Sequence, residues 1–163
     1  MRVGIGFDTH RFTFGRSLVL AGIKVPFSLG LAGHSDADVV THALIDALLG
    51  SVAAGDIGAH FPDSDERYRD IASLKLLAET VKIVGSKGYR IVNIDIMVLL
   101  EEPKIAEFRV EMRQSLANVL EIDISQISIK ATTTEGLGFT GRGEGIAAQA
   151  VVMVKESNQS IGK

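Results

Sequence analysis

The sequence predicts a single α+β domain, because strand-like and helix-like segments alternate along a chain of one-domain length. The chain has 163 residues, which is enough for one continuous hydrophobic core. Apolar side chains recur at every second residue in some segments and at every third or fourth residue in others, which are the periods of strands and helices. No repeat or linker divides residues 1–163. The order of strands, two helices, a strand, a helix and two strands predicts one domain with helices packed on a sheet.

The amino-terminal segment is predicted to be a strand followed by a hairpin. Val3, Ile5 and Phe7 alternate with small or polar neighbours, so residues 2–10 have the period of a strand. Residues 18–25 contain two short apolar runs separated by Ala-Gly, which indicates a short hairpin.

Two helices are predicted in the next part of the chain. The polar loop 33–38 should precede the first helix, since it holds several residues that cap helices well. That helix should extend to about Val52, and residues 56–69, which are rich in Asp and contain Pro62, should form a loop. The second helix is predicted over 71–84. Apolar residues at helical spacing define the buried sides, Val39, Ala43, Ala47 and Leu48 in the first helix and Ile71, Leu74, Ala78 and Val81 in the second.

The rest of the chain is predicted to contain a long strand, a third helix and two more strands. Residues 89–100 alternate clearly, with Val92, Ile94, Ile96, Val98 and Leu100 on one face. The other face is too apolar to be freely solvated, and it carries Ile91, Asn93, Asp95, Met97 and Leu99. The third helix should begin at about Pro103, and the last strands should lie near 126–134 and 145–155.

Composition excludes several classes of protein. The formal net charge of −3 gives no general attraction to nucleic acid or to anionic membranes. No apolar run approaches the roughly 18 to 20 residues that span a bilayer. The first residues enter a strand pattern directly, which leaves no room for a targeting peptide, so we expect a cytoplasmic protein. Because the chain has no cysteine, disulfides and thiolate ligands are excluded, and any metal must be held by His and carboxylate groups.

A candidate metal site begins with Asp8 and His10, which are two residues apart on a predicted strand and therefore project from the same face. A third ligand from another segment would complete a catalytic metal site with an open position. His42 lies on the first predicted helix, one turn from both Asp38 and Asp46. Either carboxylate could orient its imidazole by accepting the second ring N–H. The alternatives are a hydrogen-bonded strand end and a half-buried histidine without a ligand.

Two polar loops are candidates for substrate binding. His34 and Ser35 stand just before a predicted helix, where free backbone N–H groups favour anions. Helix capping alone is the alternative. The loop with Asp56, Asp63 and Asp65 could hold a second metal or a polyol, although such loops are more often merely solvated.

The glycine-rich stretch 132–145 contains the pattern G-x-G-x-x-G. A dinucleotide site would need a helix and a further βαβ unit after it, and here a strand follows, so that interpretation fails. The phosphate-binding pattern Gly-Lys-Ser/Thr is also missing. What remains is a run of hydroxyls, a carboxylate, backbone amides and Arg142, which could engage phosphate or a phosphate-bound cation. Alternatively, it is a glycine-rich turn in which Arg142 pairs with Glu144.

Taken together, these segments resemble one family closely, the 2-C-methyl-D-erythritol 2,4-cyclodiphosphate synthases of non-mevalonate isoprenoid biosynthesis. The matching pieces span the whole chain in family order. They are Gly6-Phe7-Asp8-Thr9-His10, Gly33 to Val39 with His42-Ala43-Leu44, Gly55-Asp56-Ile57-Gly58 with Phe61-Pro62-Asp63, Pro103-Lys104, and Ala131-Thr132-Thr133-Thr134-Glu135 through Gly145.

The resemblance implies a ferredoxin-like α+β fold, a mixed sheet with helices on one face, assembled as a homotrimer with active sites between neighbouring subunits. It implies a phosphorus–oxygen lyase. The 2-phosphate of 4-diphosphocytidyl-2-C-methyl-D-erythritol 2-phosphate attacks its own β-phosphorus, which expels CMP and closes 2-C-methyl-D-erythritol 2,4-cyclodiphosphate. It also implies that Asp8, His10 and His42 bind Zn²⁺, one ion per subunit, and that Glu135 binds Mg²⁺ or Mn²⁺ with the substrate.

By the same resemblance, His34 and Thr133 stabilise the transition state. Substrate binding is expected from residues in four segments, namely Ser35; Asp56, Ile57, Gly58, Phe61, Pro62, Asp63, Ser64 and Asp65; Leu100, Glu101, Glu102, Pro103, Lys104, Ile105 and Ala106; and Ala131, Thr132, Thr134, Phe139 and Arg142. Glu101 and Glu102 stand where the family often carries uncharged residues, and if the nucleotide is recognised there through backbone groups, both side chains can point to solvent. Two rival functions fit parts of the pattern, a zinc phosphodiesterase or other metallohydrolase, and a trimeric module that binds isoprenoid diphosphates without turnover.

Overall fold

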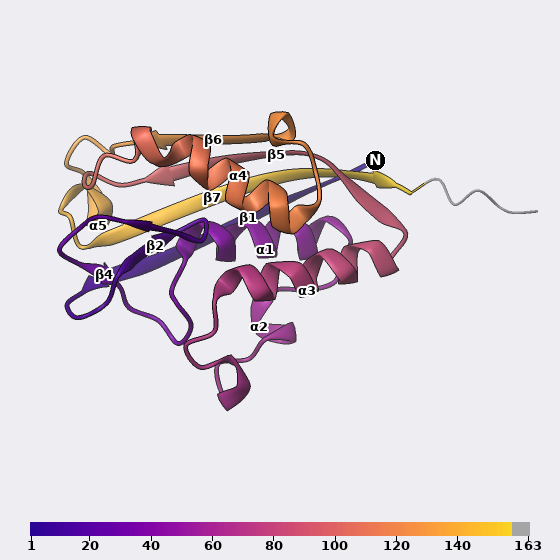
Figure 1. Cartoon of the computed structure of the whole chain (residues 1–163), viewed down its shortest axis with the longest axis horizontal. Coiled ribbons are helices and arrows are strands. Elements are labelled where there is room, and N and C mark those ends of the chain that lie inside the picture. Colours follow the sequence, from indigo (N-terminus) through magenta and orange to yellow (C-terminus); the bar gives the residue numbers. More distant parts are fainter. Residues whose placement is uncertain (158–163) are drawn as a thin grey trace, which may run out of the picture.

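The computed structural model of the chain describes residues 1–157, which form a mixed β-sheet with helices packed against it (Figure 1). The main sheet has five strands in the order β4-β1-β7-β5-β6, and β2 and β3 form a small hairpin beside it. The strands are β1 (Arg2–Thr13), β2 (Leu18–Leu20), β3 (Ile23–Val25), β4 (Gly30–Leu31), β5 (Tyr89–Leu99), β6 (Ile127–Thr132) and β7 (Gly145–Glu156). The helices are α1 (Val39–Ser51), α2 (Ile57–His60), α3 (Ser73–Ser86), α4 (Arg109–Leu120) and α5 (Gly138–Gly141), with short 3₁₀ turns at Glu66–Tyr68, Ala106–Phe108 and Ile124–Gln126.

The mixed α+β sheet is confirmed, but the order of its elements differs from the ferredoxin-like order. A ferredoxin-like domain runs β-α-β-β-α-β, whereas this chain runs β1, α1 and α3, β5, α4, β6, β7. Because α4 carries the chain back across the sheet, β5 and β6 pair in parallel. The other pairs, β1 with β4, β1 with β7 and β5 with β7, are antiparallel. The last strand, β7, then inserts between β1 and β5.

The three long helices α1, α3 and α4 lie on one side of the sheet (Figure 1). Helix α1 rests directly on β1, since a Cβ atom on Gly4 or Gly6 would overlap the backbone oxygens of Ala47 and Ala43. Buried residues occur all around α1 rather than along one stripe, because α3 covers the side that faces away from the sheet. His42 is one of the few partly exposed positions that remain on α1.

The opposite side of the sheet is apolar and open. Val3, Ile5 and Phe7 on β1 are 62%, 63% and 55% exposed, and Val151 on the neighbouring β7 is 40% exposed. We call these four residues the open face. No other segment among residues 1–157 covers them.

Element boundaries depart from the expectations in three places. The third helix begins at Arg109 rather than near Pro103, so residues 100–105 are free to line a pocket. The short helix α2 forms within the expected loop, where Asp56 caps it through the N–H of Ala59. An irregularity between Ile91 and Asn93 in β5 turns Ile91 to the buried side of the sheet, where it is 7% exposed. Within the part of the chain that the structure describes, no helix combines the length and the apolar character that crossing a membrane requires.

Candidate functional site

The sequence-predicted ligands Asp8, His10 and His42 come together where β1 passes over α1. His10 Nε2 lies 3.0 Å from Asp8 Oδ2, and His42 Nδ1 lies 3.1 Å from Asp8 Oδ2 and 3.1 Å from His10 Nε2. Among residues 1–157 this is the one group of three side chains whose donor atoms are placed to hold a metal ion. Zinc with bonds of about 2.0 to 2.1 Å in a tetrahedron keeps its ligand atoms about 3.3 Å apart. The three atoms therefore fit one face of such a tetrahedron.

The proton arrangement at His10 favours a cation at this place. His10 Nδ1 lies 2.7 Å from the carbonyl oxygen of Ala32, which can only accept. In the neutral ring Nδ1 thus carries the hydrogen, and Nε2 presents a lone pair to Asp8 and His42. Lone pairs this close repel one another unless a proton or a cation lies between them. The donor set suits a divalent metal with nitrogen and oxygen preferences.

Burial and charge act in opposite directions on these ligands. Burial, the largest influence on Asp8, raises the pKa of its carboxyl, but the hydrogen bonds and charges of His10 and His42 together hold that pKa well below its usual range. Burial likewise lowers the pKa of His10, and the hydrogen bond and charge of Asp8 outweigh it, so the pKa of His10 lies above its ordinary value. Asp8 is therefore an anion between two imidazoles, the form in which a carboxylate binds metal.

The expectation that Asp38 or Asp46 orients His42 is wrong. Asp38 is fully buried and accepts from the backbone N–H groups of Ala21 and Gly22 and from Thr41 at the start of α1. Asp46 accepts from the N–H of Ile57. Both carboxylates therefore accept backbone hydrogen bonds, Asp38 from the β2–β3 hairpin and the start of α1, and Asp46 from the start of α2.

His42 finds its second contact outside its own helix. Its Nε2 lies 2.8 Å from Ser73 Oγ and 3.1 Å from Ser35 Oγ. Ser73 is the first residue of α3 and is 31 positions away in sequence. No spacing in the sequence pointed to Ser73, because its side chain reaches His42 only when α3 packs on α1.

The three ligands lie in a pocket of about 390 Å³, which we call the metal pocket. It is lined by Asp8, His10, Gly33, His34, Ser35, His42, Asp46, Ile57, Gly58, Phe61, Pro62, Asp63, Tyr68 and Leu76. His34 Nε2 is buried there without a hydrogen-bond partner among the described residues. A buried ring nitrogen of this kind is available to a ligand that enters the pocket.

The backbone on either side of His34 is tied down. Arg16 donates from Nη1 to the carbonyl of Gly33 at 2.5 Å, and from Nη2 to the carbonyl of Ser35. The carbonyl of His34 itself accepts from the N–H of Asp70 at 2.9 Å. Consequently His34 has a fixed position although it lies in a loop.

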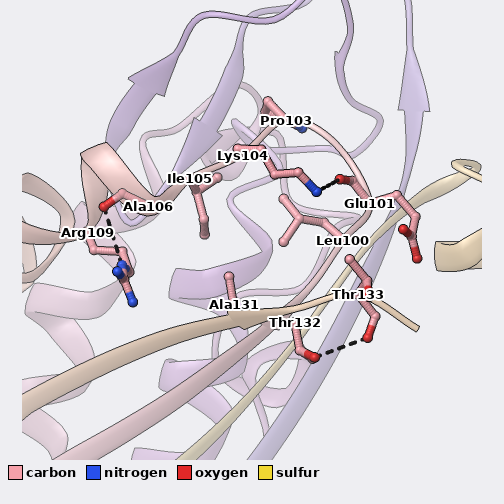
Figure 2. Close-up of a pocket in the computed structure, with 10 residues that line it drawn as sticks. All are labelled: Leu100, Glu101, Pro103, Lys104, Ile105, Ala106, Arg109, Ala131, Thr132 and Thr133. Atoms are coloured by element: carbon pink, nitrogen blue, oxygen red, sulfur yellow. Dashed lines mark hydrogen bonds between the residues drawn. The ribbon is translucent and has the colours of Figure 1, made fainter. Parts of the chain in front are cut away.

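A second pocket of about 290 Å³ lies where the parallel strands β5 and β6 end, and we call it the strand-end pocket (Figure 2). Its lining residues are Leu100, Glu101, Pro103, Lys104, Ile105, Ala106, Arg109, Ala131, Thr132 and Thr133. Figure 2 shows the segment 100–106 facing Ala131 and Thr132 across the pocket, with Lys104 Nζ donating to the carbonyl of Glu101 at 3.1 Å. Arg109, the first residue of α4, also lines it and was not expected from the sequence.

The two pockets share no lining residue but lie at the same level of the sheet. Thr9, between the ligands Asp8 and His10, pairs with Ala147 on β7, Ala147 pairs with Leu99 on β5, and Leu99 pairs with Thr132 on β6. Three strand spacings of about 4.8 Å make this row about 14 Å long.

The loop after β6 is organised by Glu101. Its Oε1 accepts from the N–H of Thr134 at 3.0 Å, so this side chain turns toward the loop rather than to solvent. Thr133 Oγ1 donates to Glu135 Oε1 at 2.6 Å. The loop also needs a glycine at Gly141, because a Cβ there would overlap the backbone of Gly136.

Several expected substrate residues line neither pocket in this chain. Asp56 caps α2, Asp65 pairs with Arg67 at 2.6 Å, and Arg142 pairs with Glu144 at 2.7 Å. That last pair is the turn-forming alternative weighed for the glycine-rich stretch. The other residues outside the two linings are Ser64, Glu102, Thr134, Glu135 and Phe139.

The chain is similar to known proteins over almost its whole length. The model of the YgbB family matches residues 1–155. A curated 2-C-methyl-D-erythritol 2,4-cyclodiphosphate synthase from Pelotomaculum thermopropionicum is 55% identical over 160 residues, which is 98% of this chain and 99% of that protein.

Solved structures agree with the sequence comparison. IspF from Plasmodium falciparum, solved as a CDP complex, has a TM-score of 0.85 and 32% identity, covering 96% of this chain and 97% of that one. The bifunctional IspDF from Campylobacter jejuni has a TM-score of 0.92 and 42% identity. This chain is 95% covered in that match but spans only 42% of the bifunctional protein.

Proposed function

This chain belongs to the YgbB family, and we propose that it works through a metal pocket and a strand-end pocket supplied by two neighbouring copies of the chain. It is a cyclodiphosphate synthase of isoprenoid biosynthesis, a lyase-class enzyme that forms a cyclic diphosphate. The observation that carries the proposal is the convergence of three metal-ligand atoms, 3.0 to 3.1 Å apart, in a pocket that also holds the unpartnered His34 Nε2.

The metal pocket is assigned to the diphosphate of the substrate. Asp8, His10 and His42 would hold Zn²⁺ and Glu135 would hold Mg²⁺ or Mn²⁺, and these cations would supply Lewis acidity and charge neutralisation to the diphosphate. His34 Nε2, when it carries a hydrogen, donates to a phosphoryl oxygen inside the pocket, where low water content strengthens the interaction.

The strand-end pocket is assigned to the cytidine nucleotide. The structure of IspF from Plasmodium falciparum is a CDP complex, and a pocket lined by small residues such as Ala131 and Ala106 leaves room for a base and ribose. Lys104 supplies positive charge at its rim. Thr133, at the end of the same pocket, is assigned to the transferring phosphoryl group, to which its hydroxyl would donate once its hydrogen leaves Glu135 Oε1.

The reaction needs positioning more than proton transfer. An oxygen of the 2-phosphate of 4-diphosphocytidyl-2-C-methyl-D-erythritol 2-phosphate forms a bond to the β-phosphorus, and the bond from that phosphorus to the bridging oxygen breaks as CMP leaves. The attacking phosphate is already an anion near neutral pH, so no general base is required. Holding the two phosphates in line is the main contribution of the protein.

Assembly as a homotrimer would unite the two pockets. In one chain, two strands separate β1 from β6, and the open face of Val3, Ile5, Phe7 and Val151 is exposed. An apolar patch of this kind on a sheet indicates a contact between proteins. Packing the open faces of three copies around one axis would bury these side chains and bring the metal pocket of one copy toward the strand-end pocket of the next.

Incubation of the purified chain with the cytidine substrate, together with metal analysis, tests the chemistry. We expect CMP and the cyclic diphosphate in equal amounts, and about one zinc ion per chain. CMP together with a linear methylerythritol that carries two separate phosphate groups would show a metallohydrolase instead. Tight binding of isoprenoid diphosphates without CMP release would show a binding module.

Mixed assemblies test the sharing of sites between subunits. His42→Ala removes the metal pocket, and Ala131→Trp fills the strand-end pocket, so each variant alone should be inactive. In a trimer co-expressed from equal amounts of both, about a quarter of the interfaces join an intact metal pocket to an intact strand-end pocket, so about a quarter of wild-type activity should return. If both pockets of one site came from the same chain, the mixture would stay inactive.

A further inference from the structure

The side chains of Asp36, Ser73 and His42 form a continuous, partly buried series of hydrogen bonds that ends at the metal pocket. Ser73 is 0% exposed. Its Oγ donates to Asp36 Oδ1, and on the other side it lies 2.8 Å from His42 Nε2. The backbone N–H of Ser73 also donates to Asp36 Oδ2 at 3.0 Å. Both oxygens of one carboxylate are thus used to hold one serine.

Local structure explains why this carboxylate is there. Helix α3 begins after Ala72, which has no side chain able to cap it. Asp36, from the loop before α1, accepts the free N–H of Ser73 and supplies the missing cap across 37 positions of sequence. A backbone hydrogen bond from the N–H of Asp36 to the carbonyl of Ile71, 3.1 Å long, holds the two segments together. The position of Ser73 relative to α1 is therefore determined by the protein.

The hydrogens available to Asp36, Ser73 and His42 determine which nitrogen of the His42 ring keeps its lone pair for a metal. A carboxylate only accepts, so the single hydrogen of the Ser73 hydroxyl goes to Asp36. Ser73 Oγ can then only accept from His42 Nε2. This contact places the ring hydrogen on Nε2, and in the neutral ring Nδ1 then presents its lone pair to Asp8 and His10. In the metal-free chain Asp8 Oδ2, 3.1 Å from Nδ1, acts against Ser73, because a carboxylate favours a hydrogen on Nδ1.

Ser35 could favour the opposite arrangement. Its Oγ lies 3.1 Å from His42 Nε2 and accepts from the N–H of Ala37 at 3.2 Å. Its hydroxyl hydrogen can point at Nε2, and the ring hydrogen would then lie on Nδ1. With a hydrogen on it, Nδ1 would have no lone pair available for a metal. The shorter contact to Ser73, supported by Asp36, opposes this. The two serines thus act on the same nitrogen in opposite senses.

We propose that Ser73 and Asp36 are positioning residues that hold His42 as the Nε2–H tautomer, with Nδ1 open for the catalytic cation. The inference rests on the metal role given to His42 under the proposed function. Neither residue lines the metal pocket or the strand-end pocket. Partners of this kind, which orient a ligating histidine, commonly change metal affinity by about 10- to 100-fold when they are removed.

The test compares three serine-to-alanine variants of the full chain. Ser73→Ala removes the acceptor, Ser35→Ala removes the competing hydroxyl, and Ser51→Ala is the matched control. Ser51 is 2% exposed on α1 and donates only to the carbonyl of Leu48. Two quantities are measured, the zinc dissociation constant by competition with a chelator, and the tautomer of His42 in the metal-free chain by ¹⁵N NMR at about pH 9, where imidazole is neutral.

We expect Ser73→Ala to weaken zinc binding by about 10- to 100-fold and to raise the fraction of the Nδ1–H form of His42. Ser35→Ala and Ser51→Ala should not raise the fraction of the Nδ1–H form above that of the wild-type chain. Asp36→Asn, which can still accept but has lost its charge, should give an intermediate weakening of zinc binding.

Two results would overturn the proposal. One is a zinc dissociation constant for Ser73→Ala equal to that of Ser51→Ala. The other is weaker zinc binding with the His42 tautomer unchanged, which would show that Ser73 acts by packing alone. If the wild-type chain itself bound no zinc, the proposed metal function would fail, and the NMR comparison would still decide the tautomer, since it uses the metal-free chain.

Discussion

The metal pocket and the strand-end pocket differ in how the chain builds them. The metal pocket takes most of its polar side chains from β1, the loop before α1 and α1 itself, and Ser73 at the start of α3 contacts His42 from outside the lining. Hydrogen bonds fix the positions of His10 and His42. The strand-end pocket consists of two short segments that follow β5 and β6, and small side chains and backbone groups line much of it. In the metal pocket, hydrogen bonds between side chains fix their positions. In the strand-end pocket, small side chains leave space for a ligand.

This difference leads to different consequences of substitution. A change in the metal pocket should act on the bound cation and on kcat. A change in the strand-end pocket should act on KM for the cytidine substrate and leave the zinc content unaltered. Substitutions in the two pockets should therefore have separable effects on zinc content, kcat and KM.

The largest effect is expected from His42→Ala. Removing one of three protein ligands should abolish stoichiometric zinc binding and lower kcat by about 1,000-fold or more, since a bound metal contributes several kcal/mol to such a transition state. CMP release and metal content are the measurements. His60→Ala is the matched control, because His60 Nε2 contacts only the carbonyl of Ala54, and it should retain both zinc and activity. Undiminished turnover of His42→Ala would remove the metal pocket from the mechanism.

The next largest effect is expected from Gly6→Ala, which disturbs the packing of α1 on β1. Gly6→Ala would place a methyl group against the backbone of Ala43, so α1 must shift, and His42 with it. We expect unfolding in denaturant to show a loss of about 1 to 3 kcal/mol, together with weaker zinc binding. Gly50→Ala is the control, since the nearest atom to its new Cβ is 3.9 Å away, and an alanine inside a helix should stabilise the chain by up to about 1 kcal/mol. Equal stability of the two variants would contradict the close packing of α1 on β1.

A smaller effect is expected in the strand-end pocket. Ala131→Leu narrows the space between Ala131 and the segment 100–106 (Figure 2). KM for the cytidine substrate should rise by about tenfold, which corresponds to about 1.4 kcal/mol of lost binding, while zinc content stays at the wild-type level. If Ala131→Leu lost zinc as well, the two pockets would not be independent.

The smallest effect is expected for Lys104→Ala. The Lys104 side chain is 72% exposed and lies 3.9 Å from Glu102, and exposed charges of this kind contribute little in water. KM should rise only about two- to threefold, more at low salt than at high salt. Lys82→Ala, another exposed lysine, paired with Glu79 on α3, should leave KM unchanged. A large decrease in kcat for Lys104→Ala would place this lysine nearer to the reacting phosphates than proposed.

Much of this protein follows from local sequence rules. Strand and helix periods located β1, α1, α3, β5, β6 and β7 to within a few residues, because apolar side chains must share one face of each element. Asp8 and His10 were predicted to lie on the same side of β1 because residues two apart on a strand always do. The absence of cysteine restricted the ligands to His and carboxylate groups.

Tertiary structure decided what local rules could not. The sequence placed Asp38 and Asp46 one helical turn from His42, yet its ring contacts Ser73, 31 residues away. The reason is that the direction of the His42 ring depends on how closely α1 approaches β1, and on α3 covering the other side of α1. The insertion of β7 between β1 and β5 likewise moves β1, which carries Asp8 and His10, one strand further from β6, which leads into the strand-end pocket. These are properties of packing between distant segments, and no pattern within a single segment contains them.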